Sequence, residues 1–354
     1  MPDAASVADR IRAAARDLGF DAVGMGPVEA AEDGERLRAW LREGRAGTMD
    51  YLARTADRRA DPGRAFRGAR SVVAVALSHD PGRSPGPEPP AGGPPRGFVA
   101  RYARGRDYHR VMETRLKRLR DAVVRAGGPG TRAWWAVDHT PVLDRALARN
   151  AGLGFFGKST MLIRPGLGSY FVLGEVLTDL ELPADRPRAG SCGTCERCIA
   201  ACPTGAITGP FRLDARLCIS YLTIENRGPI PEGLRRSVGT MVFGCDLCQE
   251  ACPWNRFARP ASAEDLRPRE VAADPDLLRL AAMTEDQWRS AFRASAVLRA
   301  GWNGWRRNLA VALGNCGDRA ALPALGALAA CGDPMVEEHA RWGIDEMNST
   351  TQLL

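Results

Sequence analysis

The chain has 354 residues, enough for roughly two to three domains with sizeable cores. Its first residues have neither a secretory apolar segment nor paired arginines, and no apolar run is long enough to cross a membrane, which predicts a cytoplasmic protein. The 49 basic and 42 acidic residues give a net charge of +7, which permits a polyanionic partner such as RNA without requiring one.

The first half of the chain mixes helix and strand patterns. Residues 6–18 and 108–126 have the apolar period of amphipathic helices. Residues 71–78 and 133–137 are apolar runs typical of core strands. The Pro- and Gly-rich residues 81–97 predict a surface loop.

A further helix is expected after the second strand. Thr140 would be its N-cap, Pro141 its first residue, and Gly152 would lie beyond its end. Residues 161–180 are apolar and rich in β-formers, with a hairpin turn expected at residues 168–169. Residues 1–186 are therefore expected to form one α+β domain.

Eight of the ten cysteines form two spaced groups in the middle of the chain. The first group reads C-x2-C-x2-C-x3-C-P, and the second ends in the same C-P pair. Such spacing is typical of a module with two [4Fe–4S] clusters, in which the cysteine before proline ligates the other cluster. The crossed assignment gives one cluster Cys192, Cys195, Cys198 and Cys252, and the other Cys202, Cys218, Cys245 and Cys248.

Zinc and disulfides are the alternatives for these cysteines. A zinc ribbon uses two C-x2-C pairs, so the extra cysteines and the two C-P endings fit zinc poorly. Disulfides would need an oxidising compartment, for which the sequence has no export signal. Cys316 and Cys331 lie outside the pattern and are expected to be buried structural thiols.

Three short helices are predicted near the C-terminus, at residues 302–313, 320–330 and 335–347. Their separators, GNCGD and CGDP, are alike, as in HEAT-type repeats. Fewer than two repeats are present, so this segment must lean on the rest of the protein. The expected domains are thus residues 1–186, a cluster module at 187–259, and a helical segment at 260–354.

Two short motifs are misleading. Residues 152–159 fit the phosphate-loop formula G-x4-G-K-S, but a helix precedes them and a β-rich run follows, the reverse of the required context. Residues 107–109 begin like the D-x-H-x-x-G signature of cobalt-ligating histidines, but Met112 stands where the glycine should be. Surface or core roles are expected for the four histidines, which share no metal-ligand spacing: His79, His109, His139 and His339.

Seven further stretches, in order, resemble the epoxyqueuosine reductase family over essentially the whole chain. They are M-D-Y-L-A-R (49–54), R-A-D-P (59–62), A-R-Y-A-R-G-R-D-Y-H (100–109), V-D-H-T-P-V-L-D-R (137–145), A-G-L-G-F-F-G-K (151–158), C-I-S-Y-L-T-I-E (218–225) and C-P-W-N-R (252–256).

The resemblance implies a cobalamin-dependent, iron–sulfur enzyme that modifies tRNA. Members remove the epoxide oxygen of epoxyqueuosine at the wobble position, which gives queuosine. The implied fold is a nitroreductase-like cobalamin domain, a ferredoxin-like module and a HEAT-like end. Electrons passed singly by the clusters would reach a reduced corrinoid that attacks the epoxide, while an acid protonates the departing oxygen.

The resemblance also implies the site residues. Asp138, which follows the strand at 133–137, corresponds to the family's proton donor. It would have to stay protonated, which needs an apolar pocket that Trp134 and Trp135 could provide. The corrinoid pocket would be formed by Arg59, Tyr102, Asp138, Lys158, Ser159, Leu162 and Asp246.

For tRNA, the resemblance points to residues 220–226 and to the helical end. Trp302, Trp305, Arg306 and Arg307 would offer stacking planes and phosphate partners. The remaining partner is an electron donor, and a monomer without membrane contact is expected. Two other functions stay open at this point: a reductive dehalogenase-like enzyme acting on a small molecule, and an electron carrier or scaffold without catalysis.

Overall fold

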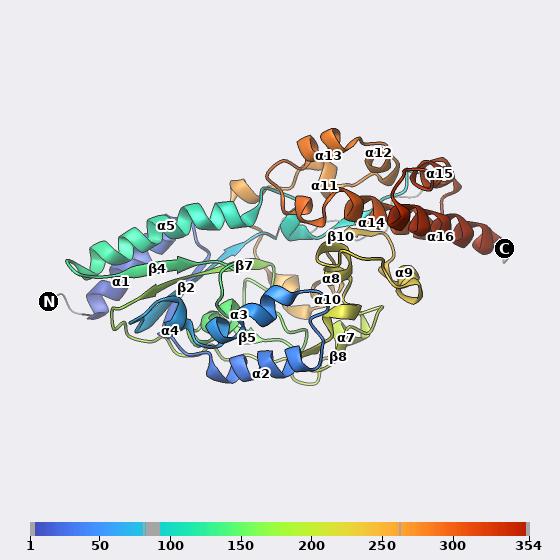
Figure 1. Ribbon diagram of the computed structural model, residues 1–354. Coiled ribbons are helices and arrows are strands. Elements are labelled where there is room, and N and C mark those ends of the chain that lie inside the picture. The colour runs from blue at the N-terminus through green and yellow to red at the C-terminus, as the bar shows by residue number, and fades with distance from the viewer. Residues whose placement is uncertain (1–3, 81, 83–92, 262, 352–354) are drawn as a thin grey trace.

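The computed structural model describes residues 4–80, 82, 93–261 and 263–351. The described chain is elongated, with its N-terminal helix at one end and its C-terminal helix at the other (Figure 1). A sheet domain occupies the N-terminal end, and the cysteine module and a group of helices occupy the C-terminal end. The arrangement places the cysteines between the sheet and the last helices.

The sheet has four antiparallel strands in the order β1-β2-β7-β4. Their bounds are β1 Ala22–Pro27, β2 Ser71–Ser78, β7 Phe171–Thr178 and β4 Ala133–Ala136. Every residue of β2 is buried, because alternate side chains enter two cores on opposite faces. Val73 and Val75 enter the first core, and Val72 and Ala74 enter the second.

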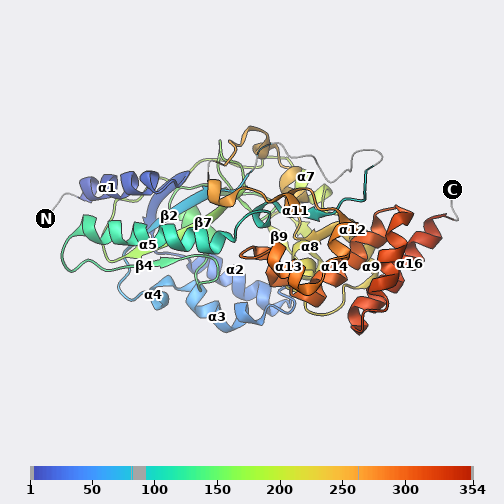
Figure 2. The ribbon, with the colours of Figure 1, turned by 90° about the horizontal axis from the view of Figure 1, so that it is seen from above.

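Helices cover both faces of this sheet. Helices α1 (Ala4–Asp17) and α5 (Tyr108–Gly127) lie side by side and share one core with β2 (Figure 2). Helix α6 (Asp144–Asn150) packs on the other face. A Cβ on Gly24 of β1 would lie 2.0 Å from the carbonyl oxygen of Ala151, so only glycine lets the end of α6 approach the strand this closely.

The remaining elements of the sheet domain are short. They are α2 Ala31–Arg42, α3 Asp50–Ala60, α4 Pro62–Ala65, β3 Phe98–Val99, η1 Arg101–Ala103, β5 Phe155–Phe156 and β6 Leu162–Ile163. The strand expected at 71–78 is confirmed, as are the two helices and the second strand within one or two residues. Of the surface loop predicted at 81–97, residues 81 and 83–92 lie outside the described residues.

Two local predictions are wrong. Thr140 does not cap a helix: its hydroxyl bonds to the backbone N–H and C=O of Val137 and closes a turn, and α6 begins only at Asp144. The turn at residues 168–169 does not join a hairpin. Gly168 bridges back to Arg164, but β6 pairs with β5, whereas β7 pairs with β2 and β4.

The cysteine module is built from short elements, since cysteine-bearing loops replace a large apolar core. They are α7 Arg197–Ala200, β8 Ile207–Gly209, β9 Arg212–Leu213, η2 Ala215–Leu217, α8 Ile219–Ile224, α9 Glu232–Val238, β10 Met241–Phe243, α10 Leu247–Glu250 and η3 Pro253–Phe257. Strand β10 pairs in parallel with β3, which ties the module to the sheet domain.

Helices form the C-terminal end. They are η4 Glu264–Leu266, α11 Glu270–Ala273, α12 Leu277–Ala281, α13 Glu285–Ala291, η5 Ala296–Ala300, α14 Trp302–Asn315, η6 Arg319–Ala321, α15 Leu322–Leu328 and α16 Pro334–Thr351. The three helices predicted there are confirmed as α14, η6 with α15, and α16. Their core contains Trp288 and Trp305 and continues into Phe243 of β10, so this segment does lean on the module. No helix in the described ranges is long and apolar enough to span a membrane.

Candidate active site

The eight grouped cysteines come together in two sets of four. Cys192, Cys195, Cys198 and Cys252 line one cavity of about 40 Å³, together with Lys158 and Trp254. This is the first set of the crossed assignment. Among the described residues, none of the cysteines forms a disulfide.

The second set lies next to the junction with the sheet domain, since Asp246 between Cys245 and Cys248 bonds to the backbone of Arg101. Burial raises the pKa of the Cys245 thiol to about 12, and the adjacent thiols of Cys218 and Cys202 add to this shift. Burial also raises the pKa of Cys248, and the nearby thiols of Cys245 and Cys218 raise it further. These four cysteines are therefore neighbours. Cys316 and Cys331 lie apart, half-buried against the helical core.

Asp138 lies just beyond β4, in a chain of short polar contacts. Its Oδ1 is 2.6 Å from Nε2 of His109, and its Oδ2 accepts a hydrogen bond from the hydroxyl of Tyr108. The other ring nitrogen of His109, Nδ1, is 2.7 Å from Oδ1 of Asp107. The imidazole is thus held between two carboxylates.

The charges of this chain follow from its geometry. Burial opposes a charge on His109, but hydrogen bonds to Asp107 and Asp138 outweigh it and raise the pKa of His109 to about 9. Burial favours the neutral form of Asp138, but the hydrogen bond and charge of His109, with the Tyr108 hydroxyl, hold its pKa below the usual value. At neutral pH the pair is an imidazolium and a carboxylate.

The expected environment of Asp138 is therefore wrong. The Asp138 side chain is 48% exposed, and its pKa is lowered where an apolar pocket would raise it. Trp134 and Trp135 project to opposite faces of the sheet and pack into separate cores. The proton of this site resides on His109, a residue for which the sequence predicted no special role.

A cavity of about 620 Å³ lies between the sheet domain and the cysteine module. Its lining includes Trp40, Arg59, Asp144, Arg145 and Phe211, and it also includes Val142 of the turn that follows Asp138. The guanidinium of Arg59 donates a hydrogen bond to the carbonyl oxygen of Val142 at 2.9 Å. Arg59 therefore lies on this cavity and holds the turn that follows Asp138.

Two buried carboxyl groups lie beside this cavity. Asp144 Oδ1 and both carboxyl oxygens of Glu175 have no hydrogen-bond donor outside this pair among the described residues. Burial raises the pKa of Asp144 to about 6, and burial with the charge of Asp144 raises the pKa of Glu175. The Asp144 and Glu175 side chains are hydrogen-bonded to each other, which pairs Glu175 with the cavity-lining Asp144.

The other predicted corrinoid contacts are dispersed. Tyr102 is half-buried and packs edge-on against Tyr108, next to Asp138. Lys158 and Ser159 line the cavity of the first cysteine set, where the ammonium of Lys158 is 3.3 Å from Glu196. Leu162 is buried in the sheet core. The structure brings Arg59 to the larger cavity, Tyr102 next to Tyr108 and Asp138, and Lys158 with Ser159 to the first cysteine set.

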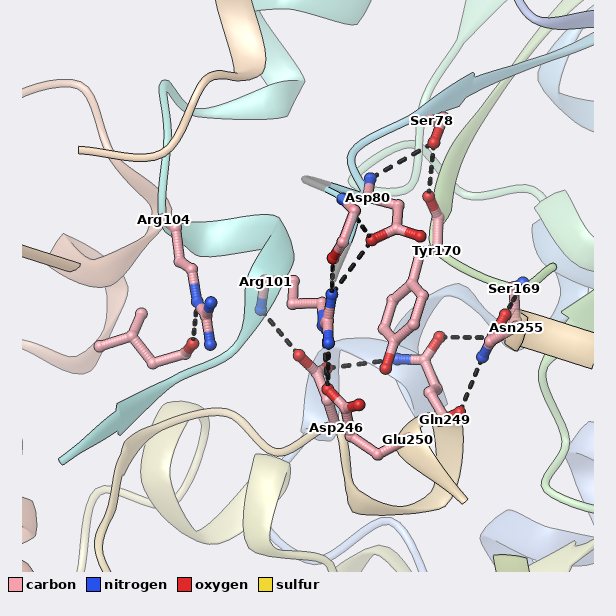
Figure 3. A network of polar contacts seen from close by, with 12 residues as sticks. Ser78, Asp80, Arg101, Arg104, Ser169, Tyr170, Asp246, Gln249, Glu250 and Asn255 are labelled. Atoms are coloured by element: carbon pink, nitrogen blue, oxygen red, sulfur yellow. Dashed lines mark hydrogen bonds and ion pairs between the residues drawn. The ribbon is translucent and has the colours of Figure 1, made fainter. Parts of the chain in front are cut away.

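Asp246 belongs to a buried polar network that joins the cysteine module to the sheet (Figure 3). Its Oδ2 accepts the backbone N–H of Arg101 at 2.7 Å. The guanidinium of Arg101 bridges Asp80 and Glu250 at 3.1 and 2.7 Å. Burial raises the pKa of Asp246 to about 6. Asp246 thus helps to hold the two parts together.

Two of the residues predicted to meet tRNA are structural. Trp305 is 0% exposed in the helical core. Arg307 is buried and donates to the carbonyl oxygens of Leu222, Asn226 and Gly228. Trp302 and Arg306 are half-buried and stack on each other. The predicted contacts of Trp305 and Arg307 with RNA are wrong, because neither side chain reaches the surface.

Comparison with known proteins identifies the chain. Residues 191–255 match the family described as 4Fe-4S double cluster binding domain, and residues 59–139 match epoxyqueuosine reductase QueG, DUF1730. The epoxyqueuosine reductase of Xanthomonas campestris is 45% identical over 97% of each chain. That of Escherichia coli is 40% identical over 97% of this chain and 90% of its own. The chain belongs to the epoxyqueuosine reductase family.

Solved epoxyqueuosine reductases have the same fold. The Bacillus subtilis structure, whose catalytic aspartate loop is swung out of the active site, has a TM-score of 0.89 and 29% identity and covers 98% of this chain and 91% of its own. Another, with a tRNA-Tyr epoxyqueuosine-modified stem loop, has a TM-score of 0.88 at 29% identity, with the same coverage. The mixed helix and strand fold with a double-cluster domain is thereby confirmed for this epoxyqueuosine reductase family member. The matched range 191–255 contains all eight grouped cysteines.

Proposed function

We propose that this protein reduces epoxyqueuosine in tRNA to queuosine. The proposal is carried by the match to epoxyqueuosine reductases along nearly the whole chain. The match includes both the Asp138 turn and the cysteine module. A relative of the same fold holds a stem loop with the modified base, which supports tRNA as the substrate. No observation favours a small-molecule dehalogenase or a carrier without catalysis.

Cobalamin is the cofactor that we propose, and the cavity of about 620 Å³ between sheet and module would receive part of it. Corrinoids carry amide arms, for which the cavity-lining carboxyl group of Asp144 and guanidinium of Arg145 are suitable partners. Arg59 of the cavity wall would contact the cofactor, and Tyr102 and Asp138 would lie at its edge. When bound and reduced, cobalamin would supply electrons to the epoxide carbon. We propose that Lys158, Ser159, Leu162 and Asp246 also lie around the bound cobalamin.

Removing an epoxide oxygen as water takes two electrons and two protons. The pair of Asp138 and His109 would supply one of these protons, since His109 holds a proton 2.6 Å from the carboxylate that would deliver it, and solvent water would supply the second. Burial already pushes the pKa of Asp138 upward, against its hydrogen bonds. When tRNA covers the half-exposed carboxylate, the greater loss of water draws the His109 proton onto Asp138, which then protonates the departing oxygen.

The crossed assignment gives the ligands of the two [4Fe–4S] clusters, with Cys252 on the cluster of the first set. Cys252→Ser should lower the iron content from about eight to about four per chain, because a single cluster would be lost. Cys331→Ser, outside both sets, is the control. Retention of all iron in the Cys252 variant would disprove the assignment.

The parts of the chain would divide the work. Residues 1–186 would form a nitroreductase-like cobalamin domain, 187–259 a ferredoxin-like module and 260–354 a HEAT-like segment. Residues 220–226 would face the anticodon loop, and Arg307 holds them by hydrogen bonds to the carbonyl oxygens of Leu222 and Asn226. Such an enzyme would act in the reducing cytoplasm as a monomer fed by an electron donor.

The test is turnover. Protein reconstituted anaerobically with iron, sulfide and cobalamin is incubated with tRNA containing epoxyqueuosine and excess dithionite, and the nucleosides are then separated. Queuosine should appear in proportion to enzyme and time. Unchanged epoxyqueuosine in the presence of intact clusters and bound cobalamin would overturn the proposal.

A further inference from the structure

The two cysteine sets face different parts of the molecule, which indicates where electrons enter. Cys245 and Cys248 flank Asp246, whose carboxylate belongs to the polar network that meets the sheet. The first set opens toward the surface: Ser191, Gly193, Thr194, Glu196 and Arg197 around its cysteines are all exposed. A carrier outside the protein can therefore approach the first set at this surface, and the second set lies between it and the sheet domain.

Two chain segments meet beside the first set. Trp254, two residues after Cys252, packs edge-on against Phe155 at 5.4 Å. A Cβ on Gly190, two residues before Cys192, would lie 2.2 Å from the same Phe155 ring. Residues 186–192 and 253–259 thus form one surface around this set, which we name the entry face.

The entry face exposes an aromatic ring among positive charges. Phe257 is 80% exposed, the most exposed large apolar side chain among the described residues. Exposed arginines lie in the two segments of this face, Arg186 and Arg188 in one and Arg256 and Arg259 in the other, and the exposed Arg197 lies beside Cys198. In the described part of the chain, none of these guanidinium groups forms an ion pair, whereas Glu196 is paired with Lys158 and Asp185 with Arg12. The unpaired charges of the entry face are therefore positive.

We propose that the entry face docks a small acidic protein that carries a single flavin or iron–sulfur centre. An exposed ring within unpaired arginines suits such a partner: the arginines steer an acidic surface, and the ring packs at its centre. The inference rests on the proposed function, because that reaction consumes two electrons per epoxide. Each docking event transfers one electron: the carrier is oxidised by one electron, and the cluster of the first set is reduced by one.

Stopped-flow reduction of the clusters tests this without tRNA or cobalamin, so its failure is distinct from failure of turnover. The probe is fully reduced flavodoxin, followed by bleaching of the iron–sulfur absorbance. Arg256→Glu and Phe257→Ser should each slow the second-order reduction about tenfold, and the wild-type rate should fall with added salt. Dithionite, which needs no docking, should reduce all variants at the wild-type rate.

Arg279→Glu is the matched control, since Arg279 is an exposed arginine on α12, far along the chain from the entry face. It should leave the flavodoxin rate unchanged. An equal loss in this control, or an equal loss with dithionite, would overturn the proposal. So would unchanged flavodoxin rates in variants that instead bind the tRNA stem loop more weakly, which would make the entry face an RNA surface.

Discussion

A single imidazole decides the chemistry of Asp138. His109 stands at the start of α5, held by Asp107, and its other nitrogen contacts a carboxylate 29 positions further along the chain. The carboxylate alone would be an ordinary half-exposed base. With the imidazolium beside it, the two residues hold one proton that can move to either.

Asp138→Asn should abolish delivery of that proton while keeping the shape of the side chain. The rate of queuosine formation should fall about 10²- to 10⁴-fold, the usual contribution of a positioned acid. Binding of tRNA and retention of cobalamin should be unchanged, as measured by filter binding and absorbance. A rate within threefold of wild type would remove Asp138 from proton transfer.

His109 should determine the fall of the reaction rate at alkaline pH, the alkaline limb of the pH–rate profile. Because its pKa is raised to about 9, the ion pair with Asp138 is complete below the ordinary histidine value and is lost as the pH rises through about 9. Single-turnover rates with dithionite should therefore fall above that pH, and His109→Gln should remove this limb and lower the neutral rate about 10- to 100-fold.

His139→Gln is the control for this pH profile. The His139 ring lies 5.5 Å from that of His109, but His139 has no hydrogen bond to Asp138 among those of the described residues. Its variant should keep the wild-type profile. A limb that persists unchanged in His109→Gln would assign it to another group.

At the scale of elements, α14 fixes the segment proposed to face tRNA. Arg307 donates to three backbone carbonyls at the end of α8 and beyond, and Asn308 donates to the carbonyl oxygens of Thr223 and Val242 at 2.8 and 2.9 Å. Burial lowers the pKa of Arg307 to about 10, which leaves it charged at neutral pH. Buried side chains thus replace the missing helix-cap partners of α8.

Arg307→Met should show how much these hydrogen bonds to the end of α8 stabilise the protein. It leaves buried carbonyls without donors, so the free energy of unfolding should fall by about 2–4 kcal/mol. Urea denaturation followed by circular dichroism measures the change, and the exposed Arg279→Met is the control. A loss below about 0.5 kcal/mol would mean that water replaces the guanidinium.

Helices and strands with a clear apolar periodicity were predictable from the sequence, whereas the tertiary contacts that they make were not. The apolar runs of β2 and α5 fixed both elements within a residue, because burial follows local pattern. The start of α6 was missed because Thr140, Pro141 and the following residues read as a capped helix start, while the hydroxyl of Thr140 bonds back to Val137. Cysteine spacing gave the two sets, whereas the contact of His109 with Asp138 is tertiary and has no local signal. Only D-Y-H within a family motif could have drawn attention to it.

At the scale of the whole molecule, the sheet domain and the cysteine module are joined by the network around Arg101. Its guanidinium bridges Asp80 from the end of β2 and Glu250 from α10, and it stacks on Tyr170 at 4.7 Å (Figure 3). Electron transfer depends steeply on separation, so a rigid junction keeps the clusters at a fixed distance from the proposed corrinoid. One buried residue therefore couples the stability of both parts.

Arg101→Met should allow the sheet domain and the cysteine module to unfold separately. Burial raises the pKa of Asp80, and Arg101 opposes that shift, so the variant leaves buried acidic groups without their cation. Breaking such a pair costs about 3–5 kcal/mol. Urea unfolding should shift accordingly, and loss of iron–sulfur absorbance should precede loss of helical circular dichroism, whereas the two coincide in wild type. Coincident transitions at the wild-type midpoint would show that β10 and the shared helical core alone hold the module in place.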